Sequence, residues 1–177
     1  MPADWLLCSY RLPREPSRLR LAVWRRVKRL GAVLLHDATW VLPADARTRE
    51  DFEWLAEEIE ERGGSVMLWE ARSLAAVQDR TVVAQFREEA DARYATIAEA
   101  AAQLARIGRR RSPKATAVEQ ALQRLRLLER ALRLERRRDY FRAVGREAAE
   151  VAVRAALQEL QSHTRPATAR RAHAVGD

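Results

Sequence analysis

The chain has 177 residues, of which 47% are hydrophobic and 33% are charged, and its formal net charge is +8. This length suits one compact domain with an extension, and the hydrophobic fraction suffices for a core, which excludes a disordered polymer. The many alanine, leucine, arginine and glutamate residues favour helix.

The positive charge is concentrated in two segments. The net charge is +5 over residues 1–50, −7 over 51–100, +8 over 101–150 and +2 over 151–177. Two basic segments on either side of an acidic one indicate a polyanionic partner. The alternative is a general preference for arginine, as in basic proteins from GC-rich genomes.

The cysteine content and the length of the apolar runs indicate the cellular compartment of the protein. Cys8 is the single cysteine, so an internal disulfide is excluded. The apolar run at the N-terminus is too short for a signal sequence or a membrane span, and no other window approaches 18 apolar residues. We therefore expect a soluble, cytoplasmic protein without a membrane partner.

The first elements in chain order are a strand, a helix and a strand pair. Residues 5–12 form a short apolar run that ends at Pro13, which is typical of a buried strand. A helix is predicted from Ser17, as N-cap, to Leu30, with Gly31 ending it. Residues 32–43 predict two strands joined by a tight turn, or one bent strand.

A second helix and a last strand complete this half of the chain. Thr48 and Asp51 resemble a capping box that opens a helix, and Gly63-Gly64 would end it. Residues 65–70 are the last strand candidate. The order fits an α+β fold, a ferredoxin-like βαββαβ unit with both helices on one face of an antiparallel sheet. The other face needs a cover, either a partner subunit or the remaining hundred residues.

The remaining residues predict a long helical hairpin or extension. A helix over about 74–107 carries an apolar seam, and a second helix from about Lys114 has leucines at helical spacing. Residues 139–145 interrupt it, and a final helix covers about 146–160. The predicted domains are thus 1–72 (α/β), 73–162 (helical) and a disordered tail over 163–177.

No motif for catalysis or metal binding is present in the sequence. His36, His163 and His173 are far apart, and no C-x-x-C or H-x-x-x-H pattern occurs. Cys8 lies within an apolar strand, where a thiol is usually a small hydrophobe. We therefore expect no catalytic residue, no metal and no cofactor, and a protein that is not an enzyme.

The acidic segment has a simple structural explanation. Its carboxylates fall on the polar face of the predicted second helix, and a solvated face is favoured over an acid/base pair. These residues are Glu53, Glu57, Glu58, Glu60 and Glu61.

The arginine clusters are the strongest functional signal. Arginine suits phosphate because its planar guanidinium can donate two parallel hydrogen bonds. The candidate nucleic-acid-binding residues are Arg18, Arg20, Arg25, Arg26, Lys28, Arg29, Arg109, Arg110, Arg111 and Lys114. A further cluster lies on the later helix, at Arg133, Arg136, Arg137 and Arg138. The alternatives are a helix face balanced by glutamates, or a small oxyanion bound near the start of the first helix.

Three stretches resemble one known family. They are WLLCSYRLPREPSRLRLAVWRRVKRLGAVLLHDATWVLP, EEIEERGGSVMLWEAR and RDYFRAVGREAAEVA. The chain resembles, over residues 4–162, the N-terminal domain of the chromate-resistance regulator ChrB family. The resemblance implies a transcription regulator that contacts double-stranded DNA at a chromate-resistance operon, with chromate as a possible oxyanion effector. Family members commonly carry a further C-terminal domain, so we expect either a single-domain relative or a chain whose sensing half lies elsewhere.

The predicted fold is also similar to the central domain of PaaX-type repressors and to the small CRISPR adaptation nucleases, which are ferredoxin-like dimers. Those nucleases have a metal-associated Asp after the first strand, whereas this chain has residues 9–13, SYRLP, with Arg11 near that place. The leading hypothesis is a homodimeric DNA-binding regulator. The alternatives are a non-enzymatic helical interaction module and, third, a metal-dependent nuclease.

Overall fold

A computed structural model describes residues 4–14 and 17–163. The predicted disordered tail over 163–177 falls almost wholly outside these residues. The elements are β1 (Asp4–Arg11), α1 (Ser17–Leu30), β2 (Val33–His36), β3 (Thr39–Pro43), α2 (Ala46–Glu61), β4 (Ser65–Arg72), α3 (Ala76–Gly108), α4 (Ala115–Arg138) and α5 (Gly145–Gln161). No described helix is long and apolar enough to cross a membrane.

The chain forms two compact units. The first comprises Met1–Glu88 with Arg138–Phe141, and the second comprises Glu89–Arg137 with Arg142–Asp177. The boundary predicted at residues 72–73 coincides with the end of β4. The first unit, however, also takes in the first turns of α3 and a short return segment before α5.

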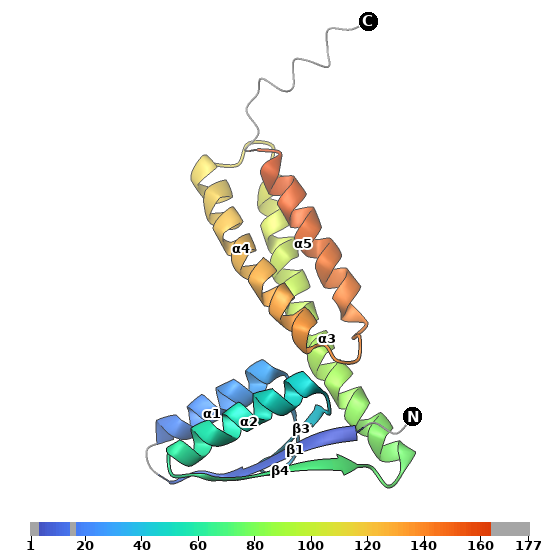
Figure 1. Cartoon of the computed structure of the whole chain (residues 1–177). Coiled ribbons are helices and arrows are strands. Elements are labelled where there is room, and N and C mark those ends of the chain that lie inside the picture. The colour runs from blue at the N-terminus through green and yellow to red at the C-terminus, as the bar shows by residue number, and fades with distance from the viewer. Residues whose placement is uncertain (1–3, 15–16, 164–177) are drawn as a thin grey trace, which may run out of the picture. The chain divides into compact units, whose positions relative to one another are not determined.

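The first unit contains the βαββαβ arrangement that the sequence predicts. Its sheet has the order β2-β3-β1-β4, and every neighbouring pair is antiparallel. Helices α1 and α2 lie together on one face of this sheet (Figure 1). The turn between β2 and β3 places Asp37 at φ 45°, a left-handed conformation that Asp tolerates better than most residues.

The other face of the sheet is covered in part by the chain itself. Trp5 of β1 stacks on Phe86 of α3 with ring centroids 6.1 Å apart, and its indole N–H donates to Asp79. Phe141 packs against both rings, and the Tyr140 hydroxyl donates to the Leu30 carbonyl. The first turns of α3 and the return segment therefore supply part of the cover that this face needs, at Trp5 of β1.

The start of α2 differs from the sequence-based prediction. The helix begins at Ala46, and Asp45 rather than Thr48 is its N-cap. The Asp45 carboxylate accepts from the Thr48 backbone N–H at 2.7 Å, and the Thr48 hydroxyl accepts from the Asp45 N–H at 3.0 Å. Thr48 is therefore the reciprocal partner in the capping box, and the prediction that it opens the helix is wrong by one turn. The N-cap role predicted for Ser17 rests on a side chain outside the described residues.

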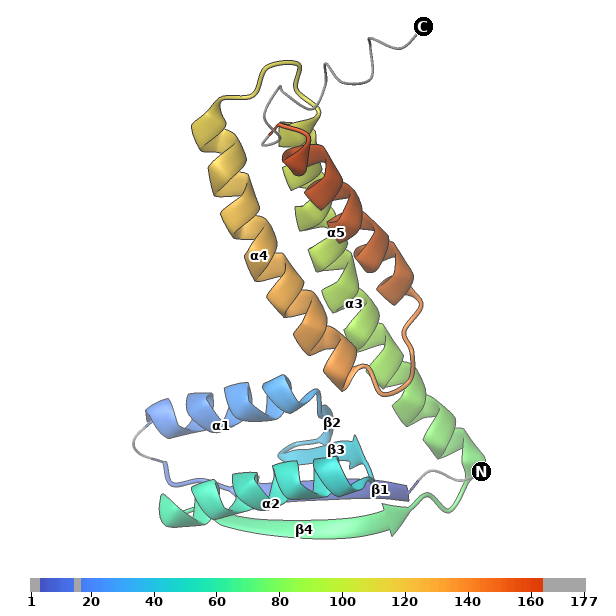
Figure 2. The same cartoon turned by 45° about the horizontal axis from the view of Figure 1, so that its top comes forward.

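The second unit is a bundle in which α4 and α5 pack beside the later turns of α3 (Figure 2). The predicted seam of α3 is buried, with Ala90, Tyr94, Ile97, Ala101 and Leu104 all at most 7% exposed. Leu122, Leu125, Leu128 and Leu132 of α4 face it, and α5 contributes Ala149, Val153, Ala156 and Leu160. Gly108 allows close packing, because a Cβ there would lie 2.7 Å from the Glu159 backbone.

Cys8 is fully buried in the core of the first unit, as its place in an apolar strand predicts. Burial raises the pKa of the Cys8 thiol to about 12, so the thiol stays protonated at any pH below that value. Because the thiolate is the reactive form, we expect no reaction with Ellman's reagent at pH 8 until the protein unfolds. One thiol per chain should appear in denaturant. Rapid labelling of the native protein would contradict the buried position.

Candidate nucleic-acid interface

The arginines of α1 occupy two sides of the helix. Arg18, Arg25 and Arg29 are exposed and recur at helical spacing, so they form one outward row. The buried face of the helix consists of Leu19, Val23 and Val27, which enter the core of the first unit. Nothing in the described part of the chain is paired with the three arginines of this row, so their charge faces solvent.

The other basic residues predicted on α1 are held in different environments. Arg20 is exposed and lines an apolar hollow with Trp24 and Leu21. The Lys28 ammonium lies 5.5 Å from the centre of the Trp40 ring, a cation–π geometry. Arg26 is half-buried, and its Nε has no hydrogen-bond partner in the structure. The six predicted residues are therefore not one surface.

Helix α2 limits what the α1 row can bind. It packs beside α1 on the same face of the sheet (Figure 1). Four of the predicted solvated glutamates on it are exposed, and the fifth, Glu58, pairs with Arg62 at 2.9 Å. These glutamates carry the same negative charge as phosphate. Within a Debye length of about 10 Å they would repel a phosphate backbone that approached from this side. The α1 row is therefore available mainly to a ligand that keeps clear of α2.

The loop between α3 and α4 holds the second predicted group. Arg109 is committed to Glu159 at 3.1 Å, whereas Arg110, Arg111 and Lys114 are exposed. Arg111 also borders a hollow with His163, whose ring contacts the Gly108 carbonyl. Three of the four predicted loop residues thus remain open to a ligand.

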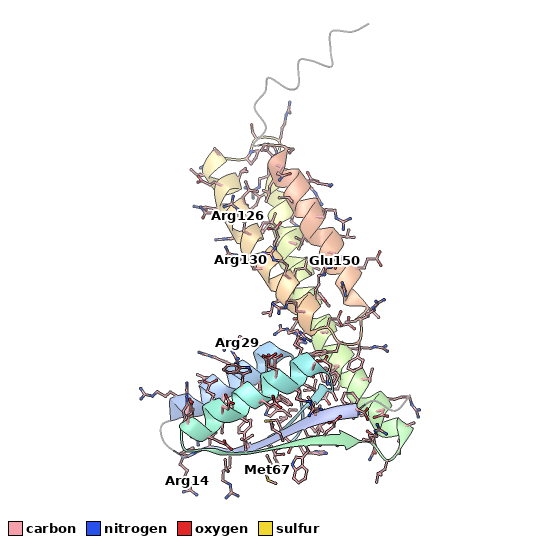
Figure 3. All side chains as sticks on the ribbon, in the orientation of Figure 1. Arg14, Arg29, Met67, Arg126, Arg130 and Glu150 are labelled. Atoms are coloured by element: carbon pink, nitrogen blue, oxygen red, sulfur yellow. The ribbon has the colours of Figure 1, made fainter. Side chains whose placement is uncertain are left out.

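A row of arginines on α4 was only partly found in the sequence. Arg126, Arg130 and Arg133 are exposed at spacings of four and three residues, on one flank of α4 beside the buried Leu125 and Leu132. Figure 3 shows Arg126 and Arg130 along α4. Among the described residues no hydrogen bond or ion pair engages these three guanidinium groups. The sequence contains this signal, because Arg126, Arg130 and Arg133 fall outside the leucine seam of α4.

Two arginines of the predicted cluster on α4 have structural roles. Arg136 pairs with Glu150 at 3.3 Å, and Arg138 donates to the Lys28 carbonyl at 3.0 Å. Arg138 also packs tightly, since a Cβ on Gly31 would lie 2.7 Å from its Cβ. Gly31 additionally has φ +81°, so it serves both the turn and this close approach. Of the four arginines in that cluster, Arg133 belongs to the exposed row.

The sequence analysis predicts no metal site and places Arg11 near the end of the first strand. Within residues 4–14 and 17–163 no group of three or more His, Cys, Asp or Glu side chains could hold a metal ion. At the end of β1, Arg11 is exposed and Tyr10 lines the apolar hollow near α1. Burial raises the pKa of the Tyr10 hydroxyl.

These features define a class of protein, an α+β sheet domain joined to a helical bundle, with exposed rows of arginine on α1 and α4. The chain belongs to the family described as protein ChrB, N-terminal, whose model matches residues 20–173. This match confirms the family resemblance found in the sequence. Comparisons with curated proteins and with solved structures gave no match, so the likeness to PaaX-type repressors and CRISPR nucleases stays a prediction.

Proposed function

We propose that this chain is a non-enzymatic DNA-binding regulator of the ChrB type, acting on a chromate-resistance operon. The observation that carries the proposal is the set of exposed arginines without partners in regular rows on α1 and α4. The membership in the ChrB N-terminal family supports the regulatory part.

Phosphate binding requires exposed cationic side chains that are not already paired with a carboxylate of the protein. The α4 row from Arg126 to Arg133 covers eight residues, and its ends are about 10 Å apart along the helix. Duplex DNA presents one negative charge for about every 1.7 Å of its axis, so several phosphates lie within reach of such a row. Arg110, Arg111 and Lys114 are further exposed cations of this unit, in the loop that precedes α4.

A titration with duplex DNA at several salt concentrations tests the proposal. The logarithm of the binding constant should fall linearly with the logarithm of the salt concentration, with a slope of about −0.9 per phosphate neutralised. Fluorescence anisotropy with labelled duplex measures both values. Undetectable binding at 50 mM salt, or binding that does not change with salt, would exclude the proposed DNA interface.

Charge reversal on α1 gives a prediction about the row identified from the sequence. Arg25→Glu with Arg29→Glu should weaken binding equally for specific and unrelated duplexes, because phosphate contacts carry no sequence information. We expect a loss of about 10-fold at 0.1 M salt. The matched control, Arg80→Glu with Arg154→Glu, makes the same change in net charge at exposed positions outside both rows. Equal losses in the two variants would show that only net charge matters.

The absence of catalysis and the response to chromate are parts of the same proposal. Incubation with DNA and magnesium or manganese should produce no cleavage, since the proposed arginines bind phosphate without supplying a nucleophile or a base. A DNA affinity that changes when chromate is added to the titration would identify the oxyanion as an effector of this chain, and an unchanged affinity would exclude that role. Cleavage of DNA that a point mutation in this protein abolishes would favour the nuclease alternative, because a contaminating nuclease would not respond to the mutation.

A further inference from the structure

We propose that β4 is the dimerisation surface of this protein and pairs antiparallel with β4 of a second copy. The inference does not depend on DNA binding. It gives a place in the fold to the homodimer that the sequence analysis predicts. It rests on the exposure, the charges and the neighbours of this one strand.

Strand β4 is an open edge of the sheet. It is the terminal strand in the order β2-β3-β1-β4, and β1 is its partner along all eight residues. In the described part of the chain no other strand pairs with it. A long edge of this kind presents backbone N–H and carbonyl groups ready to pair with another strand.

The opposite edge of the same sheet is protected. Strand β2 has only four residues, and its pairing with β3 is irregular between Leu34 and His36. The side chain of Gln85 in α3 donates to the Leu34 carbonyl at 3.1 Å. Short length, irregularity and a covering helix are the devices that keep an edge from pairing, and β4 has none of them.

The side chains of β4 are apolar where an exposed edge usually carries lysine or proline. Met67 is 56% exposed, Leu68 is 38% exposed and Trp69 is 53% exposed. Met67 and Trp69 lie on the face away from α1 and α2, where Figure 3 shows Met67. Three consecutive exposed apolar residues in a β-strand mark an association site rather than a solvated surface.

The charges of β4 do not oppose a second copy. Glu70 is paired with Arg49 of α2 at 2.6 Å, and Arg72 is paired with Asp4 of β1. Both charged side chains of the strand are therefore neutralised inside their own chain. Two identical strands can then approach without a pair of unbalanced like charges.

Symmetry selects a register for the pair. A two-fold axis perpendicular to the sheet keeps each face on its own side, so residues on the same face must lie opposite each other. Centring the axis at Leu68 places Leu68 opposite its copy and Met67 opposite Trp69 of the second copy, twice. This register joins the thioether and indole groups, and it keeps the two Glu70 side chains apart. The resulting sheet would be continuous through both copies.

Cysteine cross-linking tests this register in the full chain without DNA. Cys8 is buried, so Leu68→Cys provides one reactive thiol. A bis-methanethiosulfonate reagent with a short spacer should link Leu68→Cys chains into dimers at least 10-fold faster than the control. The control is Val151→Cys on α5, which is 54% exposed. Equal rates for the two variants would overturn the proposed pairing.

Sedimentation tests the surface by an independent route. The native chain should sediment as a dimer at micromolar concentration, and Met67→Lys with Trp69→Lys should sediment as a monomer with an unchanged circular dichroism spectrum. Trp54→Lys on α2, where the tryptophan is 60% exposed, should leave the dimer intact. A native monomer, or a dimer that persists in the β4 variant, would refute the inference. If the β4 variant does not fold, the cross-linking rates decide.

Discussion

Replacing Arg126 and Arg130 of α4 with glutamine should reduce the slope of the salt dependence of DNA binding by about 2, because each lost phosphate contact removes about 0.9. At 0.1 M salt the affinity should fall by roughly 10-fold to 30-fold, uniformly across sequences. Glutamine keeps the length and the helix propensity of arginine closely enough that α4 should stay folded. The measurement is anisotropy titration at four or more salt concentrations.

The comparison that makes this result informative is a pair of arginines outside the rows. Arg80→Gln with Arg154→Gln removes the same net charge from exposed positions on α3 and α5. We expect its slope to match that of the native protein. If both double variants lose the same slope, binding follows net charge and α4 has no special part. If neither changes the slope, the α4 row does not contact DNA.

The sequence predicted the fold well because the relevant signals are local. Short apolar runs mark the strands, Gly31 and the Gly63-Gly64 pair mark the ends of helices, and the structure places those elements within a few residues. Thr48 misled because Ser, Thr and Asp are all good N-caps, and the choice of Asp45 depends on the whole capping box.

The candidate interface was harder to predict, because exposure and pairing depend on tertiary contacts. The sequence alone does not distinguish Lys28, Arg109 and Arg136 from cations without partners. In the structure they contact Trp40, Glu159 and Glu150, respectively. Arg126 and Arg130 could have been found by marking the α4 positions that lie outside the leucine seam. The cover of the sheet by Phe86 and Phe141 could not, because these rings come from segments 55 residues apart in the chain.

Glu135 shows how a seam position can hold a charge. The residues Leu125, Leu128 and Leu132 continue at helical spacing to Glu135, which is 1% exposed. Arg93 of α3 donates to its carboxylate at 2.8 Å and also pairs with Glu89 at 3.2 Å. The arginine-rich composition around Glu135 predicts a solvated side chain, which is wrong. The helical spacing from the leucines predicts a buried position, which the structure confirms.

Replacing Arg93 with methionine should destabilise the second unit by about 3–5 kcal/mol, because a buried carboxylate loses the cation that compensates for its desolvation. For a chain of this length the midpoint of thermal unfolding should fall by about 10 °C, measured by circular dichroism at 222 nm. The control is Arg136→Met, which breaks a pair whose arginine side chain is 50% exposed. Exposed pairs contribute about 0–1 kcal/mol, so this control should shift the midpoint little.

The double variant Arg93→Met with Glu135→Leu separates the two possible causes of that loss. If the cost comes from an unpaired buried charge, removing the carboxylate as well should restore most of the stability, because a hydrophobic pair of similar volume often replaces a buried ion pair without loss. If the arginine stabilises mainly by packing its alkyl chain, the single methionine variant should already be near native stability. A double variant as unstable as the single one would mean that the Glu135 carboxylate does not cause the loss.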